Sequence, residues 1–168
     1  MVNKVAKRIR GFLIGMRYEG GKGLKSYAPS YIEAPNIRFG NNVTLFPNVH
    51  IFGSGRIEIG DNVVIGDGTV ICAAKSISIG SDSMIAAHCA IYDCNHGMHM
   101  GQVMREQPLS IRPTAIGSNC WLGVGVNVLA GVTIHDGCVV GAGTTVRKDC
   151  PGNSIVSESC PHLIKSRS

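Results

Sequence analysis

The residue of this chain best suited to proton transfer is a histidine in an irregular segment. It is His96, within Asn95-His96-Gly97, and Asp93 precedes it by three positions. An imidazole titrates near neutral pH, so it can take a proton from a hydroxyl group and release it again. Asp93 is expected to orient the imidazole ring or to bind an acceptor hydroxyl. Asn95 is expected to be a second substrate-binding residue. His99 is the alternative base.

This segment interrupts a repeat that governs the rest of the chain. From Phe39 to Ile91, an apolar residue recurs after six, six and then eight residues, and from Ile116 to Val146 it recurs every six. Between Ile91 and Ile116 the pattern stops. Long irregular segments in compact domains are usually functional or disordered. We therefore expect the candidate residues to lie on a loop, at about residues 94–113, extruded from the repeat.

The period of six indicates short strands joined by tight corners. Six residues are too few for a helix and a connection, but they accommodate a strand of about three or four residues and a bend. β-branched side chains suit the inward positions. Gly, Asn and Asp tolerate the positive φ that corners require, as in Gly40-Asn41-Asn42 and Gly60-Asp61-Asn62. Three strands make a coil of about 18 residues, and about six stacked coils bury one aliphatic core. The sequence thus predicts an all-β domain, a triangular parallel β-helix over residues 31–165.

The composition agrees with one solenoid domain. Aromatic residues make up 5% of the 168-residue chain and glycine contributes 22 residues, which fits a core filled with aliphatic side chains. No apolar run reaches the roughly 18 residues of a membrane span, and no signal-peptide pattern is seen. Seven cysteines without a Cys-x-x-Cys pair favour a reduced, cytoplasmic protein. No nucleic-acid partner is expected.

The net charge of +5 comes from the first 17 residues, which hold five basic residues and no acidic one. The remaining 11 basic and 11 acidic residues cancel. The basic residues there are Lys4, Lys7, Arg8, Arg10 and Arg17. Apolar residues three or four positions apart give the same segment the pattern of an amphipathic helix. Residues 1–30 are therefore predicted to form a basic helix and a linker. Two roles stay open: a cap over the end of the solenoid, or contact with an anionic surface at the periphery of the inner membrane.

Several stretches of the repeat carry a resemblance to a known family. They are Asn119-Cys120-Trp121-Leu122-Gly123, Leu129-Ala130-Gly131-Val132-Thr133-Ile134, Val140-Gly141-Ala142-Gly143 and Val146-Arg147-Lys148-Asp149-Cys150-Pro151. In these, and over about residues 39–165, the chain resembles the hexapeptide-repeat, left-handed β-helix acyltransferases. The left hand is implied by the resemblance alone, because parallel crossovers are normally right-handed. Within this family, bacterial acetyltransferases of surface-polysaccharide pathways are the most similar in two further stretches, Asp-x-Asn-His-Gly and Arg105-Glu106-Gln107-Pro108-Leu109.

The resemblance implies an acetyl-coenzyme-A-dependent O-acetyltransferase acting on a sugar hydroxyl in exopolysaccharide, capsule or O-antigen synthesis. It also implies a homotrimer with active sites between neighbouring prisms, His96 as general base, and no metal. The positions that match donor contacts of the family are Trp121, Val124, Ala142, Arg147 and Lys148, with Lys165 as the replacement for a tail lysine. Trp121 precedes an inward Leu122, so strand alternation should turn its ring outward. The cations suit the donor's phosphates.

Three alternatives remain open at this point. An amino-sugar acceptor would make the protein an N-acetyltransferase with the same base and donor site. A zinc enzyme of the carbonic-anhydrase type shares this solenoid, and its ligands would have to come from His88, His96 and His99, whose spacing does not match that family. A non-catalytic binding scaffold is the third alternative.

Overall fold

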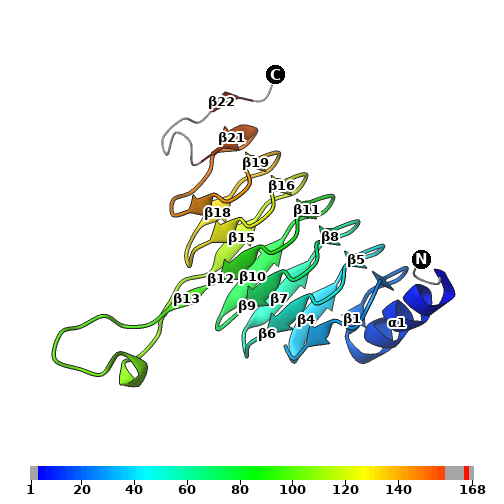
Figure 1. Cartoon of the computed structure of the whole chain (residues 1–168), viewed down its shortest axis with the longest axis horizontal. Coiled ribbons are helices and arrows are strands. Elements are labelled where there is room, and N and C mark those ends of the chain that lie inside the picture. The colour runs from blue at the N-terminus through cyan, green and yellow to red at the C-terminus, as the bar shows by residue number, and fades with distance from the viewer. Residues whose placement is uncertain (1–3, 158–164, 167–168) are drawn as a thin grey trace.

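The computed structural model describes residues 4–157 and 165–166 and shows a triangular prism of stacked coils (Figure 1). Helix α1 (Lys4–Arg17) lies at one end, and a long loop projects from the side. The predicted fold class, a left-handed parallel β-helix with a short N-terminal helix, is confirmed. None of the described helices has the length and apolar character needed to cross a membrane.

The strands form three faces of the prism. The first face contains β1 (Glu19–Gly20), β4 (Asn36–Phe39), β7 (Arg56–Ile59), β10 (Ser76–Ile79), β15 (Thr114–Ile116) and β18 (Thr133–Ile134). The second contains β2 (Lys25–Ser26), β5 (Thr44–Leu45), β8 (Val64–Ile65), β11 (Met84–Ile85), β16 (Trp121–Leu122), β19 (Val139–Val140), β21 (Ser154–Val156) and β22 (Lys165–Ser166). The third contains β3 (Tyr31–Ile32), β6 (His50–Phe52), β9 (Val70–Cys72), β12 (Ala90–Tyr92), β17 (Asn127–Val128) and β20 (Thr145–Val146).

Each coil sets its inward residue directly over that of the coil below. On the third face Ile51 pairs with Ile71, Ile71 with Ile91, and Ile91 with Val128. All four side chains are fully buried. Within the three faces the pairing is parallel except where β22 returns antiparallel to β21. The periodic apolar positions of the sequence therefore form one continuous core.

Polar side chains also stack along the corners. Asn42, Asn62 and Asp82 occupy equivalent corners of successive coils, and each has a positive φ of about 60°. The Asn42 amide donates to Asn62 at 3.2 Å, and the Asn62 amide donates to Asp82 at 2.9 Å. Asn and Asp tolerate this backbone conformation and link neighbouring corners by hydrogen bonds.

The solenoid begins earlier than the sequence suggested. Strand β1 pairs with β4 and places Gly20 opposite Phe39, and β2 places Ser26 opposite Leu45. The first coil thus lies within the region that was expected to be helix and linker, and the repeat starts at Glu19 rather than at residue 31. It escaped the periodic pattern because Gly20 and Ser26, which pair with the inward Phe39 and Leu45, are not aliphatic.

Helix α1 and the residue that follows it cover this end of the core. Tyr18, just after the helix, packs its ring edge-on against Phe39 with the ring centres 6.3 Å apart, and its hydroxyl donates to the Ile32 carbonyl at 2.7 Å. Ile14 packs on the same core. The Arg10 guanidinium donates to the Tyr27 carbonyl at 2.6 Å. One side of the helix therefore closes the end of the core, which is the capping role.

Cysteine thiols contribute to the core at the other end. Cys138 and Cys150 are buried, and every cysteine of the described chain is a free thiol. Burial, with smaller contributions from Cys138 and Asp149, raises the pKa of the Cys150 thiol to about 11. A thiolate at this position is therefore disfavoured in the folded protein.

Because the pKa of the Cys150 thiol is raised in the folded protein, we predict that the free energy of unfolding falls at alkaline pH. Unfolded thiols ionise near pH ~8.5, whereas the folded Cys150 keeps its proton to about pH 11, so stability falls as pH rises between these values. We expect Cys150→Ala to show a shallower fall in the free energy of unfolding from pH 9 to 11, measured by urea titration. Ile134→Val, beside it in the core, should keep the wild-type slope. Equal slopes in wild type and Cys150→Ala would contradict this assignment.

Candidate functional site

The loop leaves the prism at one edge, which we call the loop edge. Here the chain passes from the third face to the first, after β12, and it returns at β15. A short antiparallel pair, β13 (Cys94–Asn95) and β14 (Ser110–Ile111), forms the stem, and η1 (Met104–Glu106) lies farther out. The Thr114 hydroxyl donates to the Tyr92 carbonyl at 2.9 Å and fastens the return. The stem therefore holds both ends of the excursion at one corner.

Asp93 has a different role from the one the sequence suggested. Its side chain is fully buried, and its carboxylate accepts three backbone N–H groups, from Ala74, Lys75 and Ser76, each at 2.7 Å. Those residues form the equivalent corner of the preceding coil. The carboxylate is thus occupied inside the protein and does not face an acceptor. It fixes the point at which the loop leaves the prism.

His96 and Asn95 extend beyond this anchor. Both are exposed, and the His96 side chain has no hydrogen-bond partner among the residues that the structure describes. Its ring is accessible to a molecule that approaches the loop edge. His99, the alternative base, is also exposed on the loop.

A buried glutamine that the sequence analysis did not single out shapes the loop around His96. The Gln107 side chain accepts from the His99 N–H at 2.8 Å and donates to the carbonyls of His99 at 3.0 Å and Gln102 at 3.1 Å. Gly97 lies so close that a Cβ there would come within 2.8 Å of the Gln107 side chain. The sequence carries no sign of this burial, because Gln107 stands between Glu106 and Pro108, where a solvated side chain is the ordinary expectation.

The outer loop is apolar and exposed. Met98 and Met100 expose 80% and 98% of their surface, and the other exposed apolar residues of the loop are Val103, Met104, Leu109 and Ile111. Exposed apolar side chains gathered on one segment can mark an interaction site.

The expected donor-binding residues Trp121, Val124 and Ala142 lie on another part of the prism. The Trp121 ring points outward from the second face and is half-exposed, as strand alternation predicted. Val124 and Ala142 follow β16 and β19, at the edge between the second and third faces, which we call the Val124 edge. The Gly143 N–H donates to the Val124 carbonyl at 2.8 Å, so these two corners are adjacent.

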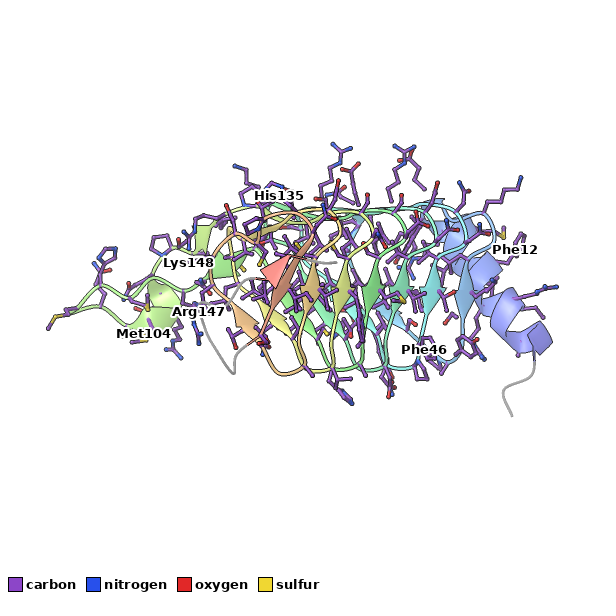
Figure 2. The ribbon with its side chains drawn as sticks, turned by 90° about the horizontal axis from the view of Figure 1, so that it is seen from above. Phe12, Phe46, Met104, His135, Arg147 and Lys148 are labelled. Atoms are coloured by element: carbon purple, nitrogen blue, oxygen red, sulfur yellow. The ribbon has the colours of Figure 1, made fainter. Side chains whose placement is uncertain are left out.

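The expected phosphate contacts lie apart from Trp121. Arg147 and Lys148 follow β20 at the loop edge, two coils beyond the loop, and Figure 2 shows them at the end of the prism opposite Phe12 on α1. Both are exposed. Lys165 lies in β22, paired with Ile155 on the second face, and its side chain is outside the described part of the structure.

One chain therefore distributes the candidate residues over two edges. His96, Arg147 and Lys148 share the loop edge, whereas Val124 and Ala142 line the other edge, with the third face between them. Within a single prism, His96 is therefore not brought together with Trp121, Val124 and Ala142.

Sequence comparison with known proteins gives matches that agree with one another. The sequence profile for "Bacterial transferase hexapeptide (six repeats)" matches residues 113–148, and that for "Hexapeptide repeat of succinyl-transferase" matches residues 56–92. The putative lipopolysaccharide biosynthesis O-acetyl transferase WbbJ of Escherichia coli is 34% identical over 148 residues, which are 82% of this chain and 76% of WbbJ. The chain belongs to the hexapeptide-repeat acyltransferases. It is an enzyme of the acyltransferase class.

Further similarities lie within the same family. The putative colanic acid biosynthesis acetyltransferase WcaF of Escherichia coli is 32% identical over 130 residues, covering 77% of this hexapeptide-repeat enzyme and 69% of WcaF. Among solved structures, the N-acyltransferase AntD of Bacillus cereus, bound to dTDP-4-amino-4,6-dideoxyglucose and coenzyme A, has a TM-score of 0.80 at 17% identity. The alignment covers 95% of this chain and 89% of AntD. At that identity the likeness shows the fold alone.

The buried carboxylate of Asp93 should stabilise the folded protein. Replacing Asp93 by Asn removes its charge and turns an N–H₂ group toward backbone N–H donors, so we expect the free energy of unfolding to fall by about 2–4 kcal/mol. Asp82→Asn is the matched control, because that carboxylate is exposed and accepts from Asn62 at a corner where Asn also tolerates positive φ. Its cost should stay below about 0.5 kcal/mol. Urea denaturation measures both, and equal values would contradict the anchoring role.

Proposed function

We propose that this enzyme is an acetyl-coenzyme-A-dependent O-acetyltransferase that modifies a sugar hydroxyl during synthesis of a surface polysaccharide in the cytoplasm. The observation that carries the proposal is the exposed imidazole of His96 on the extruded loop of a hexapeptide-repeat acyltransferase. The names of the relatives WbbJ and WcaF, which refer to lipopolysaccharide and colanic acid biosynthesis, support the acceptor class.

In the proposed mechanism His96 acts as the general base. Its neutral imidazole accepts the proton of the acceptor hydroxyl while that oxygen attacks the thioester carbonyl carbon. A backbone N–H at the donor site stabilises the oxyanion of the tetrahedral intermediate. The carbon–sulfur bond then breaks, the imidazolium returns its proton to the departing thiolate, and the products are the O-acetyl sugar and coenzyme A. Asn95, exposed beside the base, is positioned to bind the acceptor.

The donor would lie along the residues of the Val124 edge. Exposed backbone at Val124 and Ala142 offers hydrogen bonds to the pantetheine arm, and the outward ring of Trp121 offers it an apolar surface. Arg147 and Lys148 share the loop edge with His96, so those of the chain that supplies His96 would bind the phosphates by charge-assisted hydrogen bonds, with Lys165 as a further contact. The shared period of the repeat sets the spacing of these positions.

We infer a homotrimer with each active site between two chains. Within one prism His96 lies at the loop edge and Trp121 on the second face, and a neighbouring copy would bring its Trp121 to the His96 of the first chain. The exposed methionines of the loop fit a packing surface on that neighbour. The loop would then carry His96 across the subunit boundary.

An amino sugar is the second candidate acceptor, favoured by the AntD complex with an amino sugar nucleotide. An amine needs the same removal of a proton, so His96 and the donor residues would keep their roles. Assays with an amino sugar beside its hydroxyl analogue distinguish the two acceptors.

Replacing the base tests the mechanism. We expect His96→Ala to lower kcat for acetyl transfer by about 10²–10⁴-fold, since general-base catalysis contributes that much, and to leave the Kd for coenzyme A nearly unchanged. Steady-state assays and calorimetry measure the two quantities. His99→Ala is the matched control, an exposed loop histidine expected to keep near-normal kcat. Near-normal turnover of His96→Ala would remove this residue from the mechanism.

A mixing experiment tests the shared site. His96→Ala and Trp121→Glu should each be nearly inactive, but trimers reassembled from an equal mixture should regain activity at about one quarter of their sites. Those sites combine the intact His96 of one chain with the intact Trp121 of its neighbour. No recovery, in trimers shown by mass to contain both variants, would mean that one chain supplies both residues.

A further inference from the structure

Helix α1 has a second apolar surface that capping does not use. Its inner side packs Gly11 and Ile14 on the first coil. Its outer side exposes a stripe of large side chains, Ile9, Phe12, Leu13 and Met16, at 53–70% of their surface. A cap needs an apolar inner side only, and terminal caps of solenoids normally carry a polar outer face. The stripe therefore indicates a partner for this end of the prism.

The charges around the stripe identify the chemistry of that partner. Arg8 and Arg17 are exposed and flank the stripe on its two sides, and α1 contains no acidic residue. The nearest acid in sequence, Glu19, lies 3.6 Å from Arg38. An apolar stripe bordered by cations is typical of helices that lie in the plane of an anionic membrane surface. A second copy of α1 would instead bring two cationic helices together, which is unfavourable.

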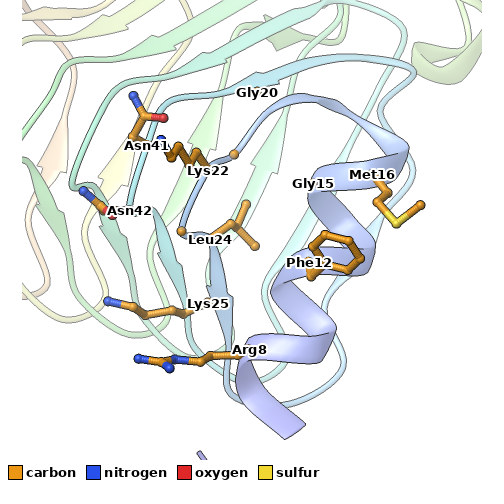
Figure 3. A pocket seen from close by; sticks show the side chains of 12 residues that line it. Arg8, Phe12, Gly15, Met16, Gly20, Lys22, Leu24, Lys25, Asn41 and Asn42 are labelled. Carbon is orange, nitrogen blue, oxygen red and sulfur yellow. The ribbon is translucent and has the colours of Figure 1, made fainter. Parts of the chain in front are cut away.

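A groove beside the helix adds further cations. It has a volume of about 870 Å³ and is lined by Arg8, Phe12, Met16, Lys22 and Lys25, with glycines leaving the space open (Figure 3). Lys22 and Lys25 belong to the first coil, so the positive charge continues from the helix onto the prism. Phosphate groups entering the groove would meet three cations while Phe12 and Met16 remain available to acyl chains.

We propose that the α1 end of the prism docks on an anionic lipid bilayer. The stripe enters the boundary between headgroups and acyl chains, and Arg8, Lys22 and Lys25 bind lipid phosphates. The loop that carries His96 leaves the prism after β12, three coils beyond the first, and projects from its side (Figure 1), so docking leaves the candidate active site in water. This inference is independent of the acceptor assigned above, because it depends on α1 and the first coil alone.

Vesicle flotation of the full chain tests the proposal. We expect binding to vesicles that contain about one third phosphatidylglycerol, no binding to pure phosphatidylcholine, and loss of binding in about 0.5 M salt. The variant Phe12→Ser/Met16→Ser and the variant Arg8→Glu should each lower the partition coefficient tenfold or more. Arg105→Glu makes the same change of charge on the exposed loop and should bind like wild type. All three variants should keep the unfolding midpoint of wild type within a few degrees.

Three results would overturn the proposal: no flotation with anionic vesicles, equal loss of binding in Arg8→Glu and Arg105→Glu, or wild-type binding by both α1 variants. A fall in assembly mass of the Phe12→Ser/Met16→Ser variant, without a change in vesicle binding, would show that a second copy covers the stripe. If that double variant does not fold, Arg8→Glu alone decides, because its side chain is exposed. Acetyl transfer to a soluble acceptor is a separate readout, so failure of docking and failure of the proposed function are distinguishable.

Discussion

The structure depends on the stacking of one inward aliphatic side chain over the next at every coil. Ile51, Ile71, Ile91 and Val128 form one such column, and each is fully buried. Burying an aliphatic side chain contributes about 1.5–3 kcal/mol, and the repeat multiplies that contribution along three faces. The core therefore needs only the inward positions. The corners are left free to carry polar residues, glycines or a long insertion.

The candidate site uses this freedom at one corner. The carboxylate of Asp93 ties the start of the loop to three N–H groups of the previous coil, and Thr114 ties its end to Tyr92. Between these fixed points Gln107 organises the loop on which His96 is exposed. The same rigid period that positions the loop also keeps Trp121 on another face. His96 and Trp121 therefore lie on different parts of one prism, and for this reason the proposed site uses two chains.

The sequence predicts most of the fold, because the period of six is a direct consequence of the inward side chains. It also predicts the loop and the outward direction of Trp121. It does not reveal the first coil, where Gly20 and Ser26 stand opposite Phe39 and Leu45 and break the aliphatic period. Nor does it reveal the buried roles of Asp93 and Gln107. A polar residue in a loop looks the same in sequence whether it serves a substrate or the backbone, and only the contacts distinguish the two.

The central claim is that His96 of one chain meets the thioester end of a donor held by its neighbour. A crystal structure of the assembled protein with coenzyme A tests this most directly. The account predicts the coenzyme sulfur beside the His96 imidazole of one chain, with the pantetheine arm along Trp121 of the next. A coenzyme bound far from every His96 in the assembly, or held entirely by the chain that supplies the imidazole, would contradict it.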